Sequence, residues 1–119
     1  MGALAFFDFL IADGATTSNA VDLREYDVVA FQADASFDGA TISFLSSGDA
    51  NPDGPTAKGY DAVVDSGGAA VTVTITDDRY IVLAQATQFL LAGLAWTKIV
   101  SASTETGAQT LRVIARRCL

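Results

Sequence analysis

The chain has 119 residues, half of them apolar and only 18% charged, and its formal net charge is −7. This length suits one domain over residues 1–119, with a core large enough to be stable without disulfides or metal ions. The acidic balance argues against a nucleic-acid partner and against an anionic membrane surface, because both need a basic face and the chain holds 7 Lys and Arg residues. The apolar surplus predicts that part of the surface contacts another chain.

Cys118 is the single cysteine, and the chain has no histidine. An internal disulfide and a Cys–His nucleophile are therefore both excluded, and we expect an unpaired thiol in a reducing compartment. The apolar N-terminal run lacks a basic region and is interrupted by Asp8, so it is interpreted as a strand rather than a signal peptide. No stretch approaches the ~20 apolar residues of a membrane span, and we expect folding in a cytoplasm.

The first part of the chain predicts four strands of apolar and β-branched residues, separated by polar turns such as Asp13-Gly14. In the third strand, strict alternation assigns Val29 and Phe31 to one face and Val28 to the other. The four strands are expected at Ala5–Ala12, Ala20–Leu23, Tyr26–Ala33 and Thr41–Leu45.

The stretch Ser46–Gly59 is polar and contains both prolines, which predicts a surface loop. Within it, Asp49, Asn51 and Asp53 alternate ahead of Gly54, as the ligands of a calcium loop do. The twelfth position, where such a loop needs an acid, is an aromatic residue, so a solvated loop without metal is expected.

The stretch Ala69–Leu83 is the most regular pattern in the chain. Aliphatic residues alternate with threonines from Val71 to Thr76, which predicts a strand with one buried face. Asp77 and Asp78 favour a turn, and an apolar run from Tyr80 follows. We predict that the two strands pair with each other as a hairpin.

Three further strands and one short helix are expected around this segment. The helix begins after Leu83 and ends at Gly93, because good helix formers are followed there by a residue that favours a helix terminus. The strands are expected at Tyr60–Val64, Trp96–Ala102 and Thr110–Ala115.

About eight short strands with one helix predict an all-β fold, an antiparallel β-sandwich of the jelly-roll type. The sandwich buries one face of each strand between its two layers. The residues expected to be mostly buried are Val71, Val73, Ile75, Ile81, Leu83, Phe31, Phe44, Trp96 and Val113.

Signatures of catalysis are missing from the sequence. It contains no Gly-x-Ser-x-Gly elbow and no phosphate-binding loop, and without histidine the usual zinc sites lack their ligands. We therefore predict no catalytic residue, no cofactor and no metal. Trp96, Phe37 and Tyr60 leave one alternative open, a sugar-stacking platform as in lectin-like sandwiches.

Eight segments of the chain follow a recognisable pattern and order, namely Ser18–Leu23, Tyr26–Gln32, Ala40–Phe44, Asp53–Gly54, Val71–Ile75, Arg79–Ile81, Leu94–Ile99 and Ala108–Val113. In this pattern and order the sequence resembles a family of small virion-associated proteins of tailed bacteriophages. It departs from that pattern in its long Ser46–Gly59 loop and its apolar N-terminal strand.

The resemblance implies a non-enzymatic role on the virion, as a decoration or cement protein that stabilises the head lattice. Its implied partners are the major capsid protein and copies of itself, with a trimer favoured by the three-fold axes of capsid lattices. The resemblance also implies that the protein lies on the capsid surface after assembly in the host cytoplasm. The alternative is a carbohydrate-binding jelly-roll module.

Overall fold

The fold is an all-β sandwich with one short helix, as the sequence predicts. The computed structural model describes residues 3–34, 36–48 and 59–117, and nine strands lie within these ranges. In chain order the elements are β1 (Leu4–Ile11), β2 (Val21–Asp22), β3 (Tyr26–Ala33), β4 (Thr41–Ser47), β5 (Asp61–Ala62), β6 (Thr72–Thr74), β7 (Tyr80–Val82), α1 (Gln85–Leu91), β8 (Trp96–Ser101) and β9 (Gln109–Arg117).

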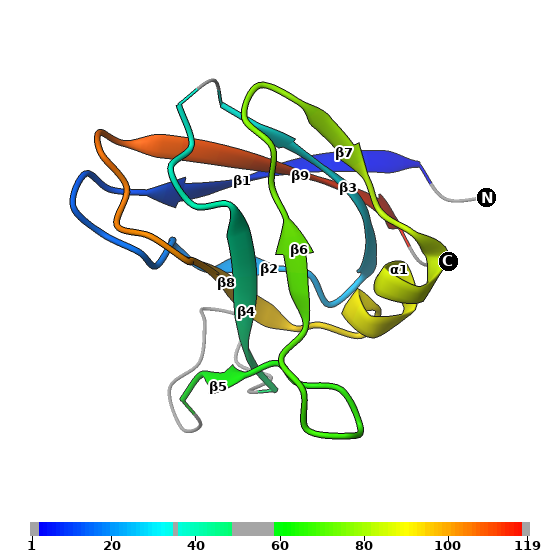
Figure 1. Ribbon diagram of the computed structural model, residues 1–119. Coiled ribbons are helices and arrows are strands. Elements are labelled where there is room, and N and C mark those ends of the chain that lie inside the picture. The colour runs from blue at the N-terminus through cyan, green and yellow to red at the C-terminus, as the bar shows by residue number, and fades with distance from the viewer. Residues whose placement is uncertain (1–2, 35, 49–58, 118–119) are drawn as a thin grey trace.

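The strands form two antiparallel sheets that pack face to face (Figure 1). Sheet A has the order β1-β9-β3-β7, and sheet B has the order β2-β8-β4-β5, with β6 also paired to β4. Strands β4, β5 and β6 follow one another within sheet B. Every other pair of consecutive strands is divided between the two sheets. This alternation is the strand order of a jelly roll.

The predicted hairpin of β6 and β7 is wrong. The two strands belong to different sheets, because β6 pairs with β4 and β7 pairs with β3. The segment between them crosses the edge of the sandwich, where Ile75 donates its N–H to Ala40 and Asp78 donates its N–H to Asp34. Asp78 has a φ of 54°, which turns the chain toward the other sheet. The crossing lets each strand join a separate sheet and close the core from opposite sides.

Strand β3 carries a bulge that the sequence pattern did not predict. Its register against β9 shifts between Val28 and Ala30, so strict alternation fails at Val29. As a result Val28 is buried in the same core as Phe31, and Val29 is only half-buried. The predicted assignment of Val28 and Val29 to the two faces is therefore reversed.

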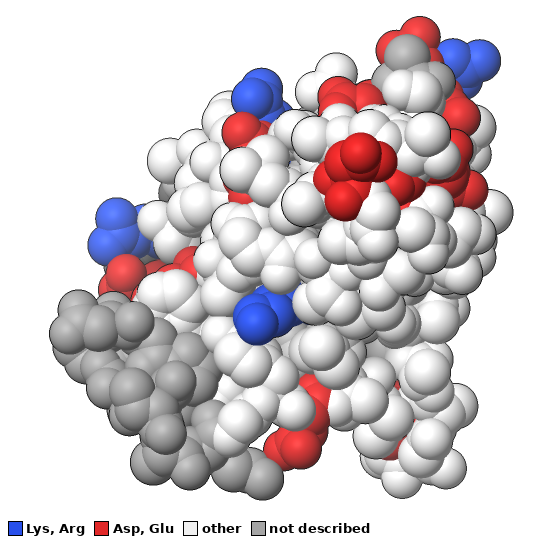
Figure 2. Space-filling view, turned by 90° about the vertical axis from the view of Figure 1, so that its left-hand side faces the viewer, with Lys and Arg blue, Asp and Glu red and all other residues white. Residues whose placement is uncertain are grey.

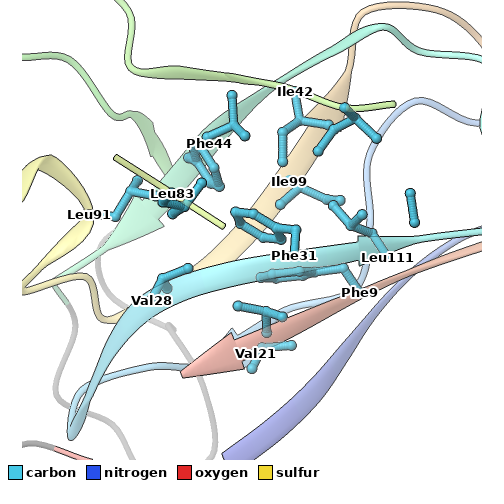
Figure 3. Packing of buried hydrophobic residues seen from close by; sticks show 14 of the residues in the cluster. Phe9, Val21, Val28, Phe31, Ile42, Phe44, Leu83, Leu91, Ile99 and Leu111 are labelled. Carbon is cyan, nitrogen blue, oxygen red and sulfur yellow. The ribbon is translucent and has the colours of Figure 1, made fainter. Parts of the chain in front are cut away.

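The core lies between the inner faces of the two sheets (Figure 3). Val71, Val73 and Ile75 are buried and the threonines between them are exposed, so the predicted register of this segment is confirmed. Phe31 of sheet A approaches Phe44 of sheet B with ring centroids 6.2 Å apart. The other fully buried large residues of the cluster are Phe9, Ile11, Leu23, Val28, Ile42, Leu91, Ile99, Leu111 and Val113.

Two residues predicted to be mostly buried are less buried than expected. Ile81 packs against the core but is only partly buried, and Trp96 lies outside the core. On β8 the side chains of Thr97 and Ile99 face the core, whereas Trp96 is half-buried on the opposite face. The alternation of β8 fixes which of its residues point inward, and Trp96 has the opposite parity to Thr97 and Ile99.

The connections also differ in detail from the prediction. The strand expected at Tyr60–Val64 is reduced to the two residues of β5, and Val64 forms a single bridge with Ala70. The helix is confirmed, and Gly93 follows it with a φ of 83°, a conformation that suits glycine.

Candidate interaction surface

The outer face of sheet A carries large apolar side chains that nothing in the described structure covers. Because β1 alternates, Phe9 and Ile11 enter the core while Leu4, Phe6 and Leu10 point outward. We use the name outer apolar face for the five residues of this surface that are each more than half exposed, namely Leu4, Phe6, Leu10, Tyr80 and Val82.

The strand register shows how this face is built. Phe6 is opposite Ile114, Ile114 is opposite Ala30, and Ala30 is opposite Val82, so one apolar row crosses all four strands. The two central residues are buried, but Phe6 and Val82 at the ends of the row remain 58% and 72% exposed.

Charged residues on the same face form ion pairs. Asp8 of β1 accepts a hydrogen bond from Arg112 of β9 at 3.0 Å, and this bond raises the pKa of the Arg112 guanidinium. The Asp8–Arg112 pair therefore places one balanced pair of charges among the apolar side chains of this face, although the chain as a whole is acidic.

The two aromatic residues on the outer face of sheet B each lie beside a cation. The Arg24 guanidinium is 6.0 Å from the Trp96 ring centroid, and the Lys98 ammonium is 4.5 Å from that of Tyr60. Arg24 also binds Asp22 and thereby lowers the pKa of that carboxyl, whereas burial raises the pKa of the Tyr60 hydroxyl.

The third residue of the predicted sugar platform is not on this surface. Phe37 is buried in the core, so it offers no ring face to a ligand. Trp96 and Tyr60 are both half-buried, and they are the residues of the platform that a ligand could reach.

Acidic residues gather at one end of the sandwich, where the loops after β1 and β3 meet the loop before β9. Figure 2 views this end, and Asp and Glu atoms concentrate at its upper right. Backbone N–H groups bind these acids: Gly107 donates to Asp13 at 2.8 Å and Thr106 donates to Asp38 at 2.6 Å. The carboxylates therefore hold the loops together.

Glu105 is the buried member of this group, and sequence reasoning missed it. Its carboxylate accepts hydrogen bonds from the N–H groups of Asp38 and Gly39 and from the hydroxyl of Ser101, at 2.7, 2.9 and 2.7 Å. A polar run at residues 103–107 gave no sign that one acid in it would point inward. Its role is structural, since all three partners belong to this protein.

A polar hollow of about 310 Å³ lies beside Asp34 and Asp78, but the Asp34 carboxylate already accepts the N–H of Thr110 at 2.8 Å. Within residues 3–34, 36–48 and 59–117, no three His, Cys, Asp or Glu side chains form a group that could hold a metal ion.

Two features singled out in the sequence lie outside the described residues. These are the possible calcium ligands Asp49, Asn51 and Asp53 with the adjoining Gly54, and the thiol of Cys118. The expectation of a loop without metal stays a prediction.

Comparison with known proteins gives no relative. The chain matches no protein-family model, no curated protein and no solved structure. The helix in the described part of the chain is too short to cross a membrane.

Proposed function

We propose that this chain is a non-enzymatic structural protein of a bacteriophage virion, a decoration or cement protein that binds the capsid surface. The observation that carries the proposal is the outer apolar face. A small sandwich whose core is already well filled still exposes Leu4, Phe6 and Val82, and exposed apolar groups of this kind are typical of protein interfaces.

The proposed partners are the major capsid protein and further copies of this chain. A subunit that contacts several capsomers and itself binds a lattice firmly even when each contact is weak. The sequence resemblance supports this role, and the jelly-roll strand order is compatible with it because capsid proteins are among those that use this fold. Fold alone does not decide function, since lectin domains use it as well.

Binding to undecorated phage heads tests the proposal. We expect the pure protein to co-sediment with the heads to saturation and to raise the temperature at which they rupture. Val82→Ser should weaken the binding roughly tenfold, because it removes the most exposed side chain of the outer apolar face without touching the core.

Thr74→Ser is the matched control, since Thr74 is exposed on the other sheet. Absence of binding to the heads at high protein concentration would contradict the proposal. Equal weakening by the two variants would show that the apolar surface does not carry the contact.

A carbohydrate-binding module is the second candidate, and it rests on Trp96 and Tyr60. Both rings are partly exposed on the outer face of sheet B, and aromatic faces are common sugar-stacking surfaces. A glycan array separates the two functions: binding that Trp96→Ala abolishes would favour the module, and an empty array together with head binding would favour the virion role.

A further inference from the structure

The edge of sheet A at β1 differs from every other sheet edge in the described structure. The edge strands β2 and β5 have 2 residues each, and β6 and β7 have 3 each. Strand β1 has 8 residues and only one neighbouring strand, β9. Short edge strands limit pairing with other chains, so β1 is the edge that can accept a further strand.

The backbone groups on this edge follow from the register with β9. Ala3 accepts the N–H of Arg117, so the odd-numbered residues of this segment bond to β9. In an antiparallel ladder the residues between them point their N–H and C=O groups the other way. The open edge is therefore faced by the backbone N–H and C=O groups of Leu4, Phe6, Asp8 and Leu10.

Asn19 covers one end of this edge. Its backbone N–H donates to the Leu10 carbonyl at 3.2 Å, and its side-chain oxygen accepts the Leu10 N–H at 2.6 Å. Its amide group reaches the Asp8 carbonyl at 3.5 Å. Within the described residues, the edge-facing groups of Leu4 and Phe6 and the N–H of Asp8 have no hydrogen-bond partner. We call Leu4–Asp8 the uncovered stretch, since the 3.5 Å contact to the Asp8 carbonyl is its one partner on this edge, and Phe6 is its centre.

This stretch has none of the features that usually protect an edge strand. It contains no Lys, no Pro and no bulge, and the one charged side chain, Asp8, is held by Arg112. The side chains of Leu4 and Phe6 on the outer face are both more than half exposed. A strand added here would satisfy the backbone and cover apolar surface in one contact.

We infer that the added strand is β1 of a second copy of this chain, paired antiparallel about a two-fold axis at Phe6. Phe6 then faces Phe6 of the other copy, and Leu4 faces Asp8. The two sheets A become one continuous sheet. The uncovered stretch is symmetric about Phe6, which is what an isologous contact requires.

Charge favours the antiparallel arrangement over a parallel one. Arg116 lies beside Leu4 in the register, so pairing Leu4 with Asp8 brings Arg116 of one copy toward Asp8 of the other. Asp13, at the acidic end of the sandwich, is about 23 Å along the chain from Phe6 at the rise of a strand. The two acidic ends then lie on opposite sides of the axis, much farther apart than the screening length of ~8 Å.

The contact is small, so we expect a dissociation constant on the order of 1–10 µM. Sedimentation equilibrium of the full chain, without phage heads, should show a reversible dimer. This differs from the trimer that capsid symmetry favours, and a dimer without head binding would leave the inference standing while the virion role failed.

Opposite charges at the axis give the sharpest test. Phe6→Lys and Phe6→Glu should each be folded monomers, because Phe6 is exposed and like charges would face each other at the axis. Each should associate at least roughly tenfold more weakly than the unaltered chain. An equal mixture of the two variants should form dimers again.

Leu10→Lys and Val82→Lys are the matched controls, since both residues are exposed but lie away from the uncovered stretch. Both should dimerise as the unaltered chain does. Hydrogen exchange should slow with rising concentration at the amides of Leu4, Phe6 and Asp8 alone. A monomer at all concentrations, a trimer, disruption by Val82→Lys, or a mixture that stays monomeric would each overturn the inference.

Discussion

At the scale of single residues, Glu105 joins the loop after β3 to strand β8. It is the only buried carboxylate among the described residues, and its two oxygens bind two backbone N–H groups and the Ser101 hydroxyl. A buried carboxylate is stable only when such donors replace the water it has lost. The three hydrogen bonds fix the loop at Asp38 and Gly39 against the strand β8.

We therefore predict that Glu105→Gln destabilises the fold by about 1–3 kcal/mol. The new amide group must face a backbone N–H in either orientation, so one donor is left without an acceptor. Urea denaturation measures the change. Glu25→Gln is the control, because Glu25 is exposed and contacts Arg117 only at 3.8 Å. The urea concentration at the midpoint of unfolding should be close to unchanged in this variant. Equal midpoints for the two variants would contradict the role given to Glu105.

At the scale of elements, β6 shows how alternation and partner choice are separate properties of a strand. Its pattern correctly predicts that Val73 is buried and Thr74 is exposed. The pattern does not specify a neighbour, however, and β6 pairs with β4 rather than with β7. The facing of a strand is local, whereas its partner depends on the whole topology.

The two faces of β6 can be tested with a matched pair of substitutions. Val73→Thr keeps the shape but puts a hydroxyl into the core, so we expect a loss of about 1–3 kcal/mol. Thr74→Val makes the reverse change on the exposed face, where the effect should stay within about 0.5 kcal/mol. Thermal unfolding measures the stability of both variants. A greater loss of stability in Thr74→Val than in Val73→Thr would mean that the two faces of β6 are inverted.

At the scale of the whole molecule, the net charge of −7 opposes self-association. Salt screens this repulsion but leaves the backbone bonds and apolar contacts of the β1 edge almost unaffected. We predict that the dimer becomes several-fold tighter between about 20 mM and 500 mM NaCl. Sedimentation equilibrium at several salt concentrations measures this. Weakening by salt would indicate that ion pairs hold the copies together instead.

The sequence by itself determined the fold class, the strand facings of β4, β6 and β9, and the position of the one helix. These features depend on patterns of apolar and polar residues within short segments, and the periodicity of the sequence shows such patterns directly. The sequence also contains an apolar surplus, from which contact with another chain is expected. The sequence alone did not indicate which residues of the N-terminal strand would be exposed.

Only the tertiary structure decided the pairing of strands, the bulge at Val29, the outward position of Trp96 and the burial of Glu105. The outer apolar face was likewise decided only by the tertiary structure. Phe6 and Val82 are 76 positions apart in the sequence, and they share one row because β9 and β3 lie between their strands. The physical reason is common to all of these features: each depends on contacts between distant segments, which form only when the two sheets close on one core.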